Sequence, residues 1–166
     1  NEFERKIEAC RKQLLSKRNK RASPLLDDKT LLGWNALMIT ALVKAGTALS
    51  ENEYIIRAEG CFTFLVSYFK VEKGVAELHH TFKNGIASYP AFLDDYAYLI
   101  QACIYLQEAT SKKSYLDWAQ KLTEEVLEKF AEPDSGHFFF TAKNQDDVII
   151  RKKEFYDGAT PSGNSI

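Results

Sequence analysis

The sequence predicts a mainly α-helical fold made of repeated helical hairpins, with a small β-hairpin between repeats. Two observations lead to this prediction. Apolar residues recur at helical spacing through most of the 166 residues, and the order helix, helix, hairpin occurs twice at an interval of about 61 to 62 residues. A very apolar helix followed by an amphipathic one, repeated at this period, is typical of stacked helical hairpins that form an inner and an outer ring.

The first predicted helix covers residues 1 to about 20. Its apolar residues lie three or four positions apart among charged ones, which is the amphipathic pattern, and they are Phe3, Ile7, Cys10, Leu14 and Leu15. Pro24 ends this stretch. The basic residues from Lys17 to Lys20 are predicted to be a solvated face. Arg21 is a candidate to pair with Asp27 or Asp28, or to bind an anionic group.

The first repeat begins with a helix at residues 28–49, which is apolar on most of its circumference and is therefore expected to be buried. Ser50 and Glu53 predict a capping box for a second helix that reaches about Lys70. The alternating stretch at 77–92 contains Asn84-Gly85, the strongest short signal for a hairpin turn. The sequence thus predicts a β-hairpin after the second helix.

The second repeat consists of an apolar helix at 93–110, an amphipathic helix at 111–130 opened by Ser111, and a looser hairpin at 136–153. Residues of the two repeats match in register, and the matching pairs are Tyr54 with Tyr115, Ala58 with Ala119, Gly74 with Gly136, and Asp95 with Asp157. By this register, "YDGATPSGNSI" at 156–166 begins a third apolar helix. We therefore expect the chain to be a fragment of a longer protein.

The composition argues against several classes of partner. The 22 Lys plus Arg nearly balance the 23 Asp plus Glu, so no overall field draws the chain to nucleic acid or to a membrane surface. No uninterrupted apolar run reaches the roughly 18 residues of a membrane helix, and the charged N-terminus is unlike a signal peptide. The expectation is a soluble, cytoplasmic protein. Cys10, Cys61 and Cys103 lack metal or redox spacing and are interpreted as buried free thiols.

Three strings carry a family resemblance: "RASPLLDDKTLLGWN", "FLDDYAYLI" and "DGATPSGNS". They resemble the spermatogenesis-associated, thioredoxin-domain proteins and their bacterial relatives. The resemblance covers the whole chain and implies a partial α/α toroid, similar to the (α/α)6 barrel of six-hairpin glycosidases and of N-acylglucosamine 2-epimerase. It implies that residues 1–166 form about two and a half of the six hairpins of one toroid domain. The family's thioredoxin-like domain has no counterpart in this sequence.

The resemblance also selects candidate site residues. Those that match the family's motifs are Arg21, Pro24, Asp27, Asp28, Lys29, Trp34, Asn35, Asp94, Asp95, Tyr96, Asp157, Gly158, Ala159, Pro161, Ser162, Gly163 and Asn164. The side chains expected to bind a substrate are Arg21, Asp27, Trp34, Asn35, Asp94, Tyr96, Ser162 and Asn164. The resemblance implies no particular reaction, and a carbohydrate function follows from fold analogy alone.

Asp28, Asp95 and Asp157 are the predicted catalytic residues. Each stands near the start of an expected inner helix, so a ring would gather the three carboxylates around one mouth of the barrel. Glycoside hydrolysis needs two such groups about 5–9.5 Å apart, one as acid and one as base or nucleophile. The alternative is that each aspartate only caps a helix. The neighbouring rings of Trp34 and Tyr96 suit sugars, or they simply fill the core.

The remaining polar motifs are weaker signals. Adjacent His79 and His80 on a strand point to opposite faces, so no metal site is predicted, although either histidine is a candidate general acid or base if the hairpin overhangs the mouth. Ser162 lacks a nucleophile elbow. Phosphate-binding glycine patterns do not occur in the sequence, so no cofactor is predicted.

Two functional hypotheses follow from the sequence. The first is a carbohydrate-active or sugar-isomerising toroid, glycosidase-like or epimerase-like, that takes a small carbohydrate-like ligand. The second is a non-catalytic helical module that binds a protein or peptide and supports the thioredoxin-like domain. Whether the domain is catalytic stays open. Unpartnered apolar faces of the inner helices also predict self-association.

Overall fold

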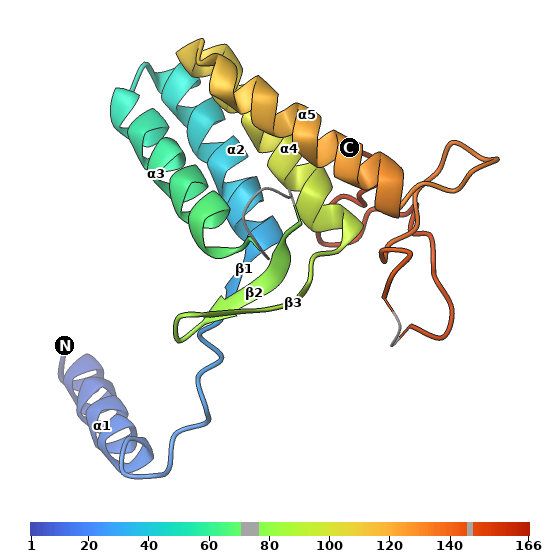
Figure 1. Cartoon of the computed structure of the whole chain (residues 1–166). Helices are drawn as coiled ribbons and strands as arrows, with labels where there is room; N and C mark the ends of the chain where they lie inside the picture. Colours follow the sequence, from blue (N-terminus) through green and yellow to red (C-terminus); the bar gives the residue numbers. More distant parts are fainter. Residues whose placement is uncertain (71–76, 146–147) are drawn as a thin grey trace.

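The computed structural model describes residues 1–70, 77–145 and 148–166. The described residues form five helices and a small three-stranded sheet. Their order is α1 (Glu2–Arg18), β1 (Thr30–Leu31), α2 (Leu32–Leu49), α3 (Asn52–Tyr68), β2 (His79–Lys83), β3 (Ile86–Pro90), α4 (Leu93–Thr110) and α5 (Lys113–Lys129), as Figure 1 shows. The predicted mainly helical fold is confirmed. Gly74, the predicted counterpart of Gly136, lies outside the described residues.

The helices repeat with one constant interval. Helices α2 and α4 start at Leu32 and Leu93, which are 61 residues apart. Helices α3 and α5 end at Tyr68 and Lys129, which are also 61 residues apart. The two apolar helices also end in the same way. Ser50 follows α2 and Ser111 follows α4, and both adopt the left-handed backbone conformation, with φ of 56° and 57°. The predicted helical repeat is therefore present.

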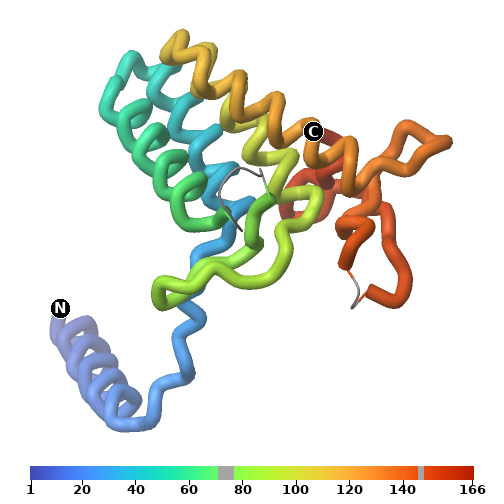
Figure 2. The backbone as a smooth tube through the Cα atoms, viewed as in Figure 1, coloured from blue at the N-terminus to red at the C-terminus, as the bar shows by residue number. Residues whose placement is uncertain are grey.

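The four repeat helices form two layers (Figures 1 and 2). Helices α2 and α4 lie side by side and run in the same direction, and α3 and α5 return along them on the other side. This is the inner and outer arrangement that the apolar and amphipathic patterns predict. Both inner helices start at the same end of the layer, next to the sheet.

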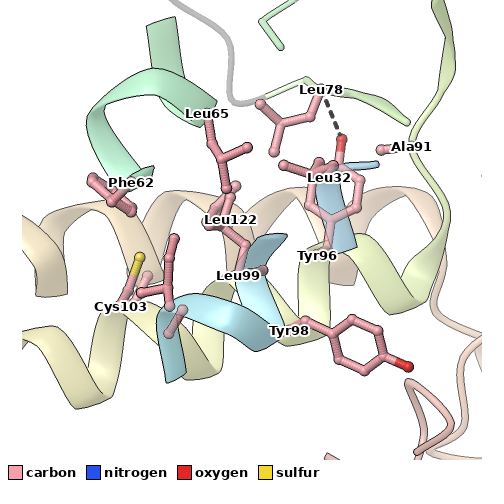
Figure 3. Close-up of a cluster of buried hydrophobic side chains, with 14 of the residues drawn as sticks. Leu32, Phe62, Leu65, Leu78, Ala91, Tyr96, Tyr98, Leu99, Cys103 and Leu122 are labelled. Atoms are coloured by element: carbon pink, nitrogen blue, oxygen red, sulfur yellow. Dashed lines mark hydrogen bonds between the residues drawn. The ribbon is translucent and has the colours of Figure 1, made fainter. Parts of the chain in front are cut away.

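The hydrophobic core lies between the two layers (Figure 3). It contains fully buried side chains from every repeat helix, among them Leu32 of α2, Leu65 of α3, Leu99 of α4 and Leu122 of α5. Full burial of one such side chain stabilises the fold by about 1.5–3 kcal/mol. The inner helices are apolar around most of their surface because they contact both a neighbouring inner helix and an outer one.

The sheet joins the start of α2 to the β-hairpin. Strand β1 pairs antiparallel with β2, and β2 pairs antiparallel with β3. Asn84 and Gly85 form the turn with φ of 51° and 81°, which only glycine adopts freely and asparagine tolerates. The hairpin predicted from this dipeptide is confirmed. On the helix side of the hairpin, Phe82 packs against Phe64 at a ring distance of 5.6 Å.

The predicted second hairpin is absent from the described residues between 136 and 153. An isolated bridge joins Ala131 to Phe138, and the Phe140 N–H donates to the Lys152 carbonyl at 2.8 Å. The half-buried guanidinium of Arg151 donates to the Thr141 carbonyl at 2.7 Å and to a carbonyl at the end of α5 at 3.1 Å. The Arg151 side chain thus uses the Thr141 carbonyl, which a regular strand ladder would have needed.

Several predicted helix starts are wrong by a few residues. Helix α2 begins at Leu32 and not at residue 28, because Thr30 and Leu31 pair with β2 instead. Ser50 and Ser111 close the preceding helices, so neither caps the next one, and α3 and α5 start after Glu51 and Lys112. The predicted third apolar helix is represented by one turn at 162–165.

Helix α1 lies apart from the repeat helices, at the end of an extended segment (Figure 1). Its predicted extent and amphipathic pattern are confirmed to within two residues, but its apolar side chains are exposed, including Phe3 and Leu14. Cys10 is exposed with them, so the prediction of a buried thiol is wrong there. Cys61 is half-buried and Cys103 is buried.

Helix α2 bears on the expectation about membranes. Among the described residues it is long and apolar enough to cross a membrane by length and composition, with 18 residues and a mean hydropathy of 1.2. Asn35 and Lys44 interrupt it, so it differs from the uninterrupted apolar run that the sequence analysis considered. In the structure α2 lies between α3 and α4, and Ala36, Ile39 and Val43 are buried there. Its apolar character is thus used in packing between helices.

Candidate functional site

The structure places Asp95 at the centre of the polar groups around the inner helix starts. Asp95 is the third residue of α4 and is only 2% exposed. Its Oδ2 accepts a hydrogen bond from the Phe92 N–H at 2.9 Å, and its Oδ1 accepts one from the Gly33 N–H at 2.8 Å. The Nδ1 of His80 lies 2.8 Å from Oδ2. One carboxylate thus joins α4, α2 and β2, and we call Gly33, His80, Phe92 and Asp95 the Asp95 cluster.

The close approach of α2 to Asp95 depends on Gly33. A Cβ at this position would lie 2.8 Å from Asp95 Oδ1 and 3.1 Å from a ring carbon of Tyr98. Carbon atoms do not pack that closely against a carboxylate oxygen, so a larger residue would push the two helix starts apart. The glycine therefore allows the hydrogen bond between the inner helices.

His80 is the accessible member of the Asp95 cluster. It lies on β2 with 28% of its side chain exposed, and its ring is 4.9 Å from that of Phe92. The Phe92 ring in turn stacks on the Phe140 ring at 4.8 Å, so Phe140 holds Phe92 in place against His80. The neighbouring His79 is oriented differently, with Nδ1 3.3 Å from the Tyr89 carbonyl. The two histidines therefore have different partners, as expected for adjacent strand residues.

Asp94 makes a second connection, to the C-terminal segment. Its Oδ1 accepts a hydrogen bond from the Gly163 N–H at 2.7 Å, and a Cβ on Gly163 would lie 2.7 Å from the same oxygen. Burial raises the pKa of the Asp94 carboxyl above its ordinary value, although the Gly163 hydrogen bond opposes this shift. Tyr98 adds a hydrogen bond from its hydroxyl to the Pro161 carbonyl, and Figure 3 shows that hydroxyl pointing away from the core.

Asp157 organises the C-terminal turn. Its Oδ1 accepts a hydrogen bond from the Ser162 N–H at 3.0 Å, which lowers the pKa of this exposed carboxyl. The buried Ser162 hydroxyl lies 2.9 Å from that of Ser165. Asn164 accepts a hydrogen bond from the Phe138 N–H and donates to the Phe138 carbonyl, both at 2.9 Å. In this structure Ser162 and Asn164 hold the segment in place.

Asp27 and Asp28 lie before the helix, on the extended segment. Asp27 pairs with Lys29 at 2.9 Å and Asp28 with Lys83 of β2 at 2.5 Å, and these lysines lower the pKa of both exposed carboxyls. Neither aspartate is at the start of α2, contrary to the sequence prediction. Arg21 is exposed, and the two carboxylates predicted as its partners are paired with lysines instead.

The three remaining predicted side chains differ in their access to solvent. Trp34 is 67% exposed and lines a hollow of about 360 Å³ together with Met38 and Thr160. Asn35 donates to the Leu31 carbonyl at 2.8 Å, within its own helix start. Tyr96 is buried and its hydroxyl accepts a hydrogen bond from the Leu78 N–H at 3.1 Å, while burial raises its pKa. Of these, Trp34 is the one whose ring is open to solvent.

The structure thus brings together Asp94, Asp95 and the C-terminal turn, while Asp28 pairs with the far end of β2. Sequence reasoning missed Gly33 and Gly163 as contact points, and it named His80 without selecting it over His79. The available signal was a glycine at the start of α2 and in the C-terminal turn, where a small residue indicates a close approach; α4 has no glycine at its start. Across the described residues, no group of three or more His, Cys, Asp or Glu side chains is arranged to hold a metal ion.

Comparison with known proteins confirms the resemblance inferred from the motifs. The chain is 32% identical over 164 residues to mouse spermatogenesis-associated protein 20, covering 93% of the chain, and 30% identical to the human protein. It is a homologue of these proteins. It is also 34% identical over 170 residues to an uncharacterised protein of Caenorhabditis elegans. The chain spans only about a fifth of the length of these relatives. No protein-family model matches it.

Solved structures show the fold more widely. A glycoside hydrolase family 76 mannosidase from Bacteroides thetaiotaomicron superposes with a TM-score of 0.64 at 17% identity, covering 80% of this chain and 36% of the mannosidase. A sugar epimerase from a ruminal bacterium superposes with a TM-score of 0.57 at 11% identity, covering 86% of this chain and 37% of the epimerase. The predicted partial α/α-toroid fold is therefore confirmed.

Proposed function

We propose that the chain is part of a carbohydrate-active toroid whose ligand site lies at the N-terminal ends of α2 and α4. The observation that carries this proposal is the hollow of about 360 Å³ beside the exposed ring of Trp34. Thr160 lines the same hollow, three residues after Asp157, and its carbonyl accepts the Gly158 N–H. An exposed aromatic face beside a turn that carries an ionised carboxylate suits a sugar ring and its hydroxyls.

The aspartates have different parts in this proposal. The exposed Asp157 carboxylate, with its lowered pKa, accepts hydrogen bonds from ligand hydroxyls, whereas Asp28 stays paired with Lys83 at the far end of β2 and has no part in the site. Asp95 is buried and bonds to Gly33, Phe92 and His80, so it supports the site from within the fold. The fold likeness to a mannosidase and a sugar epimerase supports a sugar ligand and leaves both a hydrolytic and an isomerising reaction open. In this proposal, residues 1–166 are one part of a larger toroid domain.

Titration with sugars tests the proposal. Tryptophan fluorescence would be followed while mono- and oligosaccharides of mannose, glucose and N-acetylhexosamine are added up to millimolar concentration. We expect a saturable change that disappears in Trp34→Ala. The matched control is Trp118→Phe, because Trp118 is half-buried against Phe62 on the outer layer and should leave the response intact. A complete lack of saturable response across the sugar panel would contradict the proposal.

A second candidate function is the binding of an apolar helix, from a partner protein or from a second copy. It is favoured by a groove of about 450 Å³ along α4, lined largely by apolar side chains that include Ala97, Ile100 and Ile104. Sedimentation velocity over a range of concentrations tests it. If the groove is used, Ile104→Glu should shift the chain toward monomer without changing the response to sugars.

A further inference from the structure

We propose that His80 is the residue that exchanges a proton with the ligand and that Asp95 is its positioning residue. This inference rests on the proposed function, because the proton comes from a hydroxyl of the bound sugar. It goes further than the proposed function by assigning the proton transfer to one side chain, His80. Asp95, which the sequence predicted to be catalytic, acts in this proposal through His80.

The first argument is access. Asp95 is 2% exposed, whereas the His80 side chain is 28% exposed and belongs to the same cluster. A residue that takes a proton from a ligand must come within hydrogen-bond distance of it. Asp95 is screened by the helix starts and by the His80 ring, so His80 is the member of the pair that a ligand can reach.

The second argument is the orientation of the ring. The two Asp95 oxygens accept backbone N–H groups from Phe92 and Gly33, so the carboxylate acts as an acceptor toward the His80 Nδ1 as well. The ring proton of neutral His80 is therefore held on Nδ1, and the lone pair is on Nε2. The Phe92 ring, itself stacked on Phe140, packs against the His80 ring and limits its rotation. This is the arrangement of a base oriented by a third group.

The third argument is position. Gly33, which binds Asp95, is the residue directly before Trp34, the ring that lines the proposed sugar hollow. The start of α2 therefore connects the hollow to the Asp95 cluster within one peptide unit. His79 offers a contrast on the same strand, because it contacts the Tyr89 carbonyl and has no part in the cluster.

The proposed step is a single balanced proton transfer. The O–H bond of a sugar hydroxyl breaks, its electron pair stays on the oxygen, and the proton bonds to Nε2 of neutral His80. The resulting imidazolium keeps its Nδ1 proton beside the Asp95 carboxylate, which stabilises the positive charge. The proton returns from Nε2 to an oxygen of the product, so His80 ends neutral and no other reactant is needed.

The first experiment is an NMR measurement of the histidine ring nitrogens in the 166-residue chain. Long-range proton–nitrogen correlations identify which nitrogen of His80 carries the proton near neutral pH. We expect the proton on Nδ1 in the unmodified chain and a shift of the tautomer in Asp95→Asn, a change that a purely structural role of Asp95 would not produce. Finding the His80 proton on Nε2 in the unmodified chain would overturn the proposal, regardless of the result of the sugar titration.

The second experiment repeats the sugar titration with His80→Gln and with the matched control His79→Gln. We expect sugar-dependent shifts of the His80 ring signals, at least tenfold weaker binding in His80→Gln, and unchanged binding in His79→Gln. Equal sugar binding by the two variants would overturn the role of His80 and leave the proposed function standing. If no sugar binds even to the unmodified chain, the proposed function fails, and the role of His80 toward sugars fails with it.

Discussion

Two Asp-Asp pairs of this chain, Asp27-Asp28 and Asp94-Asp95, look alike in the sequence and have different roles in the structure. Asp94 and Asp95 lie in the first turn of α4, where they accept backbone N–H groups from residues far away in the sequence. Asp27 and Asp28 lie on the exposed segment before α2 and pair with lysines at the surface. The same dipeptide connects helix starts in one place and belongs to the solvated surface in the other.

The difference arises from the distance between each pair and its helix. Asp94 and Asp95 are the second and third residues of α4, a position where carboxylates meet free N–H groups and the positive end of the helix dipole. Strand β1 separates Asp28 from α2, so it meets neither. At the interval of 61 residues, the counterparts of Asp94 and Asp95 are Gly33 and Trp34. The carboxylate that binds Gly33 is Asp95, one position after the counterpart of Gly33, so this contact joins neighbouring rather than equivalent positions of the repeat.

Replacing Asp95 by alanine in one variant and Asp28 by alanine in another gives the largest expected contrast in stability. Asp95→Ala leaves the N–H groups of Gly33 and Phe92 without their acceptor, and each buried donor left unpaired costs about 1–3 kcal/mol. We expect the free energy of unfolding to fall by about 2–5 kcal/mol. Asp28→Ala, the matched control, should leave it nearly unchanged, because its partner Lys83 stays solvated. Urea unfolding of both variants would measure this contrast.

Asp95→Asn makes the comparison stricter. On sequence grounds alone, asparagine should replace aspartate at little cost, since both cap helices well. In the structure, backbone N–H groups approach both carboxylate oxygens, so either orientation of the amide puts its NH₂ against an N–H donor. Asp95→Asn should therefore lose about 1–3 kcal/mol. A variant as stable as the unmodified chain would show that Asp95 is only a helix cap.

Glycine substitutions give the next largest effect. Gly33→Ala would place a Cβ 2.8 Å from Asp95 Oδ1, and overpacking of this kind costs about 1–3 kcal/mol. Gly60→Ala on α3 is the control, because nothing lies within 4 Å of its added Cβ and alanine favours a helix by about 0.5–1 kcal/mol. Thermal unfolding should thus show opposite changes in Tm. Equal changes at both positions would mean that α2 does not closely approach Asp95.

The sequence predicted the regular parts of this fold better than it predicted the site. Apolar periodicity located all four repeat helices, and Asn84-Gly85 located the hairpin, because these signals are local. The role of Asp95 depends on an N–H group 62 positions earlier in the chain, at Gly33, and no local pattern reports such a contact. The second hairpin was predicted from strand-like composition, but the Arg151 side chain binds the Thr141 carbonyl that its ladder needed. Site geometry arises from tertiary contacts of this kind.

The smallest expected effect separates Asp94 from Asp157 by the pH dependence of stability. Both carboxyls have an ordinary pKa of 3.8; burial raises that of Asp94 in the folded chain, and the Ser162 N–H lowers that of Asp157. Folded Asp94 therefore holds its proton longer than unfolded Asp94, so its contribution to stability declines as pH rises from about 4. Asp157 behaves in the opposite way, because its contribution is present above its unfolded pKa and is lost as pH falls through the folded value.

Two variants isolate these contributions. Asp94→Asn should gain stability relative to the unmodified chain as pH increases above about 4, whereas Asp157→Asn should lose relative stability as pH rises toward about 4 from below. The measurement is the free energy of unfolding in urea at a series of pH values from about 3 to 6. Subtracting the free energy of unfolding of the unmodified chain from that of each variant cancels the contribution of the other carboxyls. If both differences slope in the same direction, the contrast between a partly buried carboxyl at Gly163 and an exposed one at the C-terminal turn does not hold.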